Sequence, residues 1–196
     1  MQLSYDLTMS TVEVEGTEDL AKRFDNMVVG VITEVLPHPN ADSLKICKTD
    51  IGGEIKEIVC GGINVREGLH VLVALPGAIV RWHGQGDPVE IKKAKLRGVP
   101  SHGMICSERE MGLTDDHSGI LVLPEVNKSG RKVELGERFV DAYELDQEVL
   151  DISITPNRAD CLSVYGFARL IGGYLGLPVT MPSFELKEEG EDMSNA

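Results

Sequence analysis

The sequence predicts an α+β protein that is mainly β, with a small barrel interrupting a smaller α/β unit. Short apolar or alternating runs follow one another through the middle of the chain, at 27–37, 43–50, 56–62 and 70–77. Turn-rich stretches such as HPNAD and NVREG separate these runs, as expected for strands joined by short loops. Long helical patterns are missing between them. The regular spacing therefore favours a closed or partly closed β-barrel.

Three later segments extend the series of strands. VEIKKAKLRG and GMICS follow the first four runs, and GILVLPE adds one more at 119–125. This count fits a Greek-key oligonucleotide/oligosaccharide-binding (OB) barrel, although a two-sheet sandwich fits the pattern alone. In a barrel, we expect one apolar residue from each strand to lie in a common core: Val31, Ile46, Val59, Leu72 and Ile105.

The two ends of the chain carry a different pattern. STVEVEG (10–16) and EVLDISIT (148–155) alternate apolar with polar residues, which is typical of half-exposed strands. The following stretch predicts a helix that Asp160 caps and that Gly176 and Pro178 end. We therefore expect the two alternating segments to lie near each other, outside the barrel, with the helix packed on them.

These patterns divide the chain into four parts. We expect an OB domain at 27–140, a flanking α/β domain made of 1–26 and 141–183, and a polar, disordered tail at 184–196.

Composition is that of a soluble globular protein. Of the 196 residues, 42% are hydrophobic and 26% are charged. The sequence has neither the roughly 18-residue apolar run of a membrane span nor the pattern of a secretory signal at its start. Its four scattered cysteines predict buried, reduced thiols. We therefore expect a cytoplasmic protein without a membrane partner.

Charge is distributed unevenly along the chain. The formal net charge is −13, yet fourteen of the nineteen cationic residues lie within 27–140, where the balance is only −1. Screening confines the attraction of a phosphate to charges within about 8–10 Å. The overall acidity therefore does not exclude a nucleic-acid partner.

A basic strip lies within this middle segment. In a strand, Lys93, Lys95 and Arg97 share one face while Ala94 and Leu96 turn inward. Cations at this spacing suit a phosphate backbone, although a solvated outer strand has the same pattern. The residues that follow favour binding, because they offer accessible backbone, hydroxyl groups and an adaptable apolar contact: Ser101, Gly103, Met104 and Ser107.

Two loops supply further candidates. In HPNADSLKICK, the residues His38, Asn40 and Lys45 would face a ligand if this loop closes the mouth of the barrel, although a plain hairpin loop explains it equally well. Trp82 either anchors its glycine-flanked loop or offers a surface on which a base stacks.

Patterns for metal binding and catalysis are missing. The chain has no CxxC pair, GxGxxG, Walker loop or GxSxG. His102 and Cys106 lack a second ligand pair, and DDHSG at 115–119 is better explained as a turn. We therefore expect a non-catalytic chain without a metal or cofactor of its own.

Three strings together are specific: HPNADSLKICKTDIG, KKAKLRGVPSHGMICSEREMGL and DDHSGILVLPE. They resemble the tRNA-binding OB domain shared by several synthetases and free tRNA-binding proteins. The flanks LTMSTVEVEG and LDISITPNRADCLSVYGFAR resemble the family of bacterial phenylalanyl-tRNA synthetase beta subunits.

The resemblance implies a non-catalytic N-terminal part of such a beta subunit, with tRNA as its ligand. It also implies a parent enzyme of two alpha and two beta chains that uses ATP and magnesium. Two alternatives stay open: an assembly scaffold with little RNA contact, and a free-standing tRNA-binding protein.

Overall fold

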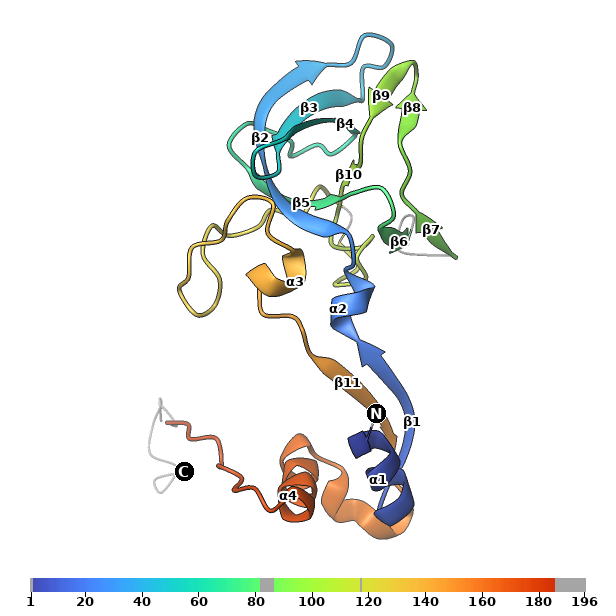
Figure 1. The fold of residues 1–196 in the computed structure, drawn as a ribbon, viewed down its shortest axis with the longest axis vertical. Helices are drawn as coiled ribbons and strands as arrows, with labels where there is room; N and C mark the ends of the chain where they lie inside the picture. The colour runs from blue at the N-terminus through green and yellow to red at the C-terminus, as the bar shows by residue number, and fades with distance from the viewer. Residues whose placement is uncertain (1, 82–86, 117, 186–196) are drawn as a thin grey trace, which may run out of the picture. The chain divides into compact units, whose positions relative to one another are not determined.

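The computed structural model describes residues 2–81, 87–116 and 118–185, which form two compact units (Figure 1). Residues 18–149 make up one unit, and residues 1–17 with 150–196 make up the other. Trp82, a possible stacking surface by its sequence, lies outside the described residues. So do residues 186–196 of the tail that the sequence predicts to be disordered. The domain boundaries inferred from the sequence stay a prediction.

A five-stranded antiparallel sheet forms the barrel of the larger unit, in the order β10-β5-β2-β3-β4. Its two end strands, β4 and β10, contact each other, so the sheet is nearly closed. This confirms the predicted mainly β fold with an OB-type barrel. The strand bounds are Met27–Pro37 for β2, Lys45–Asp50 for β3, Ile55–Cys60 for β4, His70–Ala74 for β5 and Met104–Ile105 for β10.

The connection from β5 to β10 carries two small hairpins. The first pairs β6 (Ile79–Arg81) with β7 (Pro88–Glu90), and the second pairs β8 (Ala94–Leu96) with β9 (Val99–Ser101). The single strand expected from VEIKKAKLRG is therefore divided between two hairpins. The strand expected at 119–125 contributes only an isolated bridge between Val122 and Val71.

The interior of the barrel is filled from alternate positions of its strands. The buried residues of this cluster are Ile32, Cys47, Ile58, Cys60, Val65, Leu69, Val71, Val73, Ile105 and Ile120. Val31 and Ile46, which were expected in the core, are only half-buried, and Ile32 and Cys47 take their places. The expectation of one common core for all five chosen residues is therefore wrong.

The sequence of strand β2 explains why the buried positions were assigned wrongly. Its sequence, MVVGVITEVLP, is apolar at both odd and even positions, so alternation does not say which set faces inward. A register shift between Ile32 and Glu34 in the pairing with β3 changes the phase again.

A second buried cluster covers the other face of β5. Leu72 and Ala74 belong to it, whereas Val71 and Val73 point into the barrel. Phe24 and Phe139 meet edge to face within this cluster, with ring centroids 5.2 Å apart. Two short helices frame this pair, α2 (Leu20–Arg23) and α3 (Phe139–Ala142). Strand β5 is therefore buried on both faces.

Helices and two paired strands come from the ends of the chain. Strands β1 (Glu13–Asp19) and β11 (Glu148–Ser153) form a two-stranded sheet, which confirms that these segments lie side by side. The helical elements are α1 (Gln2–Ser10), the 3₁₀ helix η2 (Pro156–Cys161) and α4 (Val164–Leu175). None of the described helices is long and apolar enough to cross a membrane.

Helix α4 begins later than the sequence predicted. Its cap is Ser163, whose side chain accepts a hydrogen bond from the backbone N–H of Gly166. Asp160 lies in the preceding 3₁₀ turn and pairs with Arg158 at 3.1 Å, so its expected capping role is wrong. The helix ends as expected at Gly176, which adopts a left-handed conformation with φ of 67°.

All four cysteines are free thiols and buried, as expected: Cys47, Cys60, Cys106 and Cys161.

The phase of the barrel core can be tested by truncating neighbouring isoleucines. We expect Ile58→Ala to lower the free energy of unfolding by about 2–5 kcal/mol, because Ile58 is fully buried. Ile46→Ala, at a half-buried position, should lower it by only about 1 kcal/mol. Urea denaturation followed by circular dichroism measures both values. Equal losses would contradict the observed phase.

Candidate nucleic-acid interface

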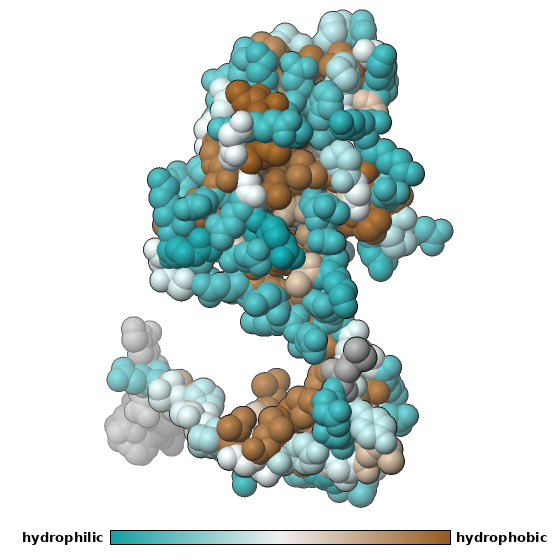
Figure 2. Space-filling model, in the orientation of Figure 1, coloured by the Kyte–Doolittle hydropathy of each residue, from teal (hydrophilic) through white to brown (hydrophobic). Residues whose placement is uncertain are grey.

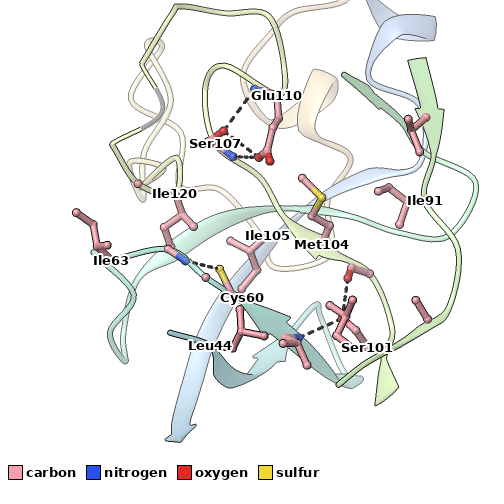
Figure 3. Close-up of a pocket in the computed structure, with 18 of the residues that line it drawn as sticks. Leu44, Cys60, Ile63, Ile91, Ser101, Met104, Ile105, Ser107, Glu110 and Ile120 are labelled. Carbon is pink, nitrogen blue, oxygen red and sulfur yellow. Dashed lines mark hydrogen bonds between the residues drawn. The ribbon is translucent and has the colours of Figure 1, made fainter. Parts of the chain in front are cut away.

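The larger unit contains a pocket of about 730 Å³ beside strands β4 and β10 (Figure 3). Figure 2 shows apolar surface on this unit, bordered by polar side chains. The lining comes from the end of β4, from β10, from the two hairpins and from the segment 118–120. Its apolar side chains include Leu44, Ile63, Ile91, Leu96, Met104, Ile105 and Ile120.

Ser101 and Gly103 shape the wall of the pocket. The Ser101 hydroxyl accepts a hydrogen bond from the Val59 backbone N–H at 3.1 Å and donates one to the Gly103 carbonyl at 3.0 Å. Gly103 has a φ of 152°, and a Cβ there would lie 2.7 Å from the Ala74 carbonyl oxygen. Both residues therefore fix the approach of β9 to β4 and of β10 to β5.

Ser107 and Glu110 form a turn at another side of the pocket. One carboxylate oxygen of Glu110, Oε2, accepts hydrogen bonds from the Ser107 backbone N–H at 2.8 Å and from its hydroxyl at 2.9 Å. Glu110 is half-buried and lines the pocket. Glu110 is absent from the candidates chosen from the sequence, although Ser-x-x-Glu is a recognisable turn signature.

The basic strip does not have the orientation that the sequence predicted. Ala94 and Leu96 are exposed and line the pocket, so the expectation that they turn into the barrel core is wrong. The reason is that β8 belongs to a hairpin, whereas the sequence suggested a barrel strand. Lys95 alternates with them and is absent from the pocket lining, as is Lys93, which precedes the strand.

Arg97 lies at the tip of the β8–β9 hairpin. Leu96 pairs with Val99, which leaves Arg97 and Gly98 as a two-residue turn. Their φ angles are 46° and 94°, the positive pair that such a tight turn requires. Arg97 is therefore displaced from the face that Lys93 and Lys95 occupy.

The three cations of the strip are available to a ligand. Lys93, Lys95 and Arg97 are exposed, and within the described part of the chain they form no salt bridge. The neighbouring Lys92 differs, because its ammonium lies 3.3 Å from the Glu90 carboxylate.

His38 and Asn40 hold the tip of this hairpin. The Asn40 backbone N–H donates to His38 Nδ1 at 3.1 Å, so the proton lies on Nε2, which donates to the Leu96 carbonyl at 3.1 Å. The Asn40 side-chain amide donates to the Arg97 carbonyl at 3.0 Å. Lys45 points elsewhere and donates to the Val65 carbonyl at 3.1 Å.

The residues predicted from the sequence thus fall into three groups. Four line the pocket: Ser101, Gly103, Met104 and Ser107. Three cations lie on the hairpin whose other face contributes to the pocket: Lys93, Lys95 and Arg97. The remaining three make hydrogen bonds within the fold: His38, Asn40 and Lys45.

A nearly closed barrel with exposed cations beside a mainly apolar pocket is typical of OB-type modules that bind nucleic acids. Residues 27–132 match the model of one such family, described as a putative tRNA binding domain. The chain belongs to this putative tRNA-binding domain family.

Curated relatives extend the similarity over the whole chain. Phenylalanine–tRNA ligase beta subunits from Nitratidesulfovibrio vulgaris and Oleidesulfovibrio alaskensis are 52% and 47% identical, over 100% and 97% of this chain. The beta subunit from Ralstonia nicotianae is 44% identical over 93%. The chain spans only 22–23% of the length of these relatives.

Among solved structures, the MetRS related protein from Pyrococcus horikoshii matches 57% of this chain and 86% of its own. The TM-score of 0.40 and the identity of 22% are too low to support an inference.

The anchoring of the hairpin predicts a local effect of Asn40→Ala. The variant loses the hydrogen bond to the Arg97 carbonyl, worth about 0.5–1.5 kcal/mol. Trypsin should therefore cleave after Arg97 roughly 2- to 10-fold faster, since cleavage follows the open population of the turn. Mass spectrometry of timed digests measures the rate. Asp42→Ala in the same loop is the control, and equal cleavage rates in the two variants would contradict the anchoring role.

Proposed function

We propose that this chain binds tRNA through the β8–β9 hairpin and the adjoining pocket, as the non-catalytic N-terminal part of a phenylalanine–tRNA ligase beta subunit. The observation that carries the proposal is the set of exposed cations without salt bridges among the described residues, on a barrel of the tRNA-binding family. In this arrangement Lys93, Lys95 and Arg97 meet phosphates, and Met104 offers an adaptable apolar contact to an unpaired base.

Electrostatics support contact through one face. The chain as a whole carries −13, so most of its surface repels a polyanion. Attraction acts only within about 8–10 Å of the exposed cations on the hairpin. Acidic surface elsewhere would restrict tRNA to the hairpin side.

We place this chain in a larger cytoplasmic enzyme, because its relatives are about four times longer and are named as ligase subunits. There it would work with a phenylalanyl-tRNA synthetase alpha subunit in a heterotetramer. ATP and magnesium would act elsewhere in that enzyme. Within the described residues of this chain, no three acidic, histidine or cysteine side chains could hold a metal ion together.

A scaffold function is the second candidate. The observation that favours it is the internal use of predicted binding residues, since His38, Asn40 and Lys45 all bond backbone carbonyls of the fold. In that case the barrel would position other parts of the enzyme and would contact tRNA weakly. A free-standing tRNA-binding protein is disfavoured by the similarity of both flanks to part of a longer subunit.

Salt dependence separates these candidates. If the three cations neutralise about three phosphates, log affinity for tRNA should fall against log salt with a slope of about −2 to −3. Lys95→Ala should reduce the magnitude of that slope by about one and weaken all tRNAs alike. Met104→Ala should lower the affinity with little change in slope, because its contact is apolar. Titrations at several salt concentrations measure each quantity.

Lys128→Ala provides the matched control, because Lys128 is also exposed but lies on a different loop. The scaffold function predicts no measurable binding by this chain. Binding that is equally sensitive to Lys95→Ala and Lys128→Ala would contradict the hairpin site.

A further inference from the structure

The pocket is lined by the carboxylate of Glu110, which would repel an RNA phosphate. Glu110 lines a mainly apolar cavity, and in the described part of the chain no salt bridge reaches it. The other lining carboxylate, Glu90, is paired with Lys92. A half-buried charge without a cationic partner is unfavourable in an apolar surrounding. A carboxylate at this wall of the pocket suits a ligand that donates hydrogen bonds.

Only one oxygen of Glu110 is available to such a ligand. Oε2 already accepts two hydrogen bonds from Ser107. Oε1 has no hydrogen-bond partner among the residues that the structure describes, and an ionised carboxylate oxygen can accept two. The neighbouring side chains Met104, Ile105 and Ile120 offer only apolar contact. The pocket therefore combines a mainly apolar lining with an available carboxylate oxygen on Glu110, while Glu90 in the same lining is paired with Lys92.

We propose that the pocket accepts an unpaired nucleobase that carries an exocyclic amino group, with Glu110 Oε1 accepting a hydrogen bond from that group. This proposal rests on the proposed function and names the part of the RNA that enters the site. Unpaired bases are commonly read by hydrogen bonds to their Watson–Crick edge inside apolar or aromatic pockets. Adenine, cytosine and guanine have such an amino group, whereas uracil presents carbonyl oxygens there.

The hairpin favours a nucleotide over a basic side chain of a protein. Ala94 and Leu96 line the pocket, and Lys95 between them belongs to the opposite face of the same strand. A base in the pocket thus has a cation available for its own or the next phosphate. A lysine or arginine side chain in the pocket would gain from Glu110 but would be repelled by Lys93, Lys95 and Arg97.

Two octanucleotides of RNA, rC8 and rU8, test this selectivity on the full chain at pH 7.5. They carry the same number of phosphates, so the contribution of the cations cancels in the ratio of their affinities. The bases differ in the group at position 4, which is an amino group in cytosine and a carbonyl in uracil. A hydrogen bond to a charged group is worth about 1.5–3 kcal/mol. We therefore expect rC8 to bind at least about 10-fold more tightly than rU8.

Glu110→Gln should reverse the preference. The backbone N–H of Ser107 needs an acceptor, so the amide oxygen takes the place of Oε2 and the NH₂ group takes the place of Oε1. The pocket then presents a donor, which suits the carbonyl of uracil and not the amino group of cytosine. Glu108→Gln, two residues away, makes the same change in charge outside the pocket lining and should keep the original ratio.

The outcomes separate this inference from the proposed function. Equal affinity of the unmodified chain for rC8 and rU8 overturns the inference without requiring any variant to fold. If tRNA binding in that case still depends on Lys95, the proposed function survives and the pocket is left for another ligand, such as a basic side chain of a protein. An unchanged ratio in Glu110→Gln also overturns it. If the chain binds neither rC8 nor rU8 nor tRNA, both proposals are overturned.

Discussion

Strand β5 is buried on both faces, and the position of the pocket depends on this one constraint. Its alternate residues enter two different cores, the barrel interior and the cluster around Phe24 and Phe139. A strand held from both sides cannot slip by one residue without exchanging the two sets of side chains. It pairs with β2 along one edge and with β10 along the other. The wall formed by Met104 and Ile105 therefore has a fixed register.

The β8–β9 hairpin has two chemically different faces. One face of β8 adds apolar side chains to the pocket, and the alternate positions carry cations. The loop between β2 and β3 fixes the hairpin through His38 and Asn40. The sequence suggested His38 and Asn40 as direct ligands of RNA. They instead hold the backbone of the β8–β9 hairpin, which carries the cations. Under the two proposals, the cations of this hairpin would attract phosphate, whereas selection among bases would depend on Glu110, which lies outside the hairpin.

The sequence allowed the barrel, the paired flanking strands and four of the residues that line the pocket to be predicted, because turn signals and charge spacing are local properties. Orientation was harder. Val31 and Ile32 are equally apolar, and only the pairing of β2 with its neighbouring strands decides which one enters the barrel core. The alternation at 93–97 predicts one two-faced strand, but only 94–96 form it, and Arg97 lies in the turn of a hairpin that composition does not mark. Glu110 was missed because its neighbours in the pocket come from distant segments.

Arg97 occupies a position where glycine or asparagine would be more relaxed. Its φ of 46° belongs to the left-handed region, and tight hairpin turns of this kind favour Asn-Gly over Arg-Gly. A sequence optimised for folding alone would therefore place a smaller residue before Gly98. The guanidinium of Arg97 therefore places a positive charge at the tip of the hairpin at some cost in local stability. Replacing this arginine by asparagine would relax the turn and remove a cation in the same step, so the conformation of the hairpin and its charge are coupled at position 97.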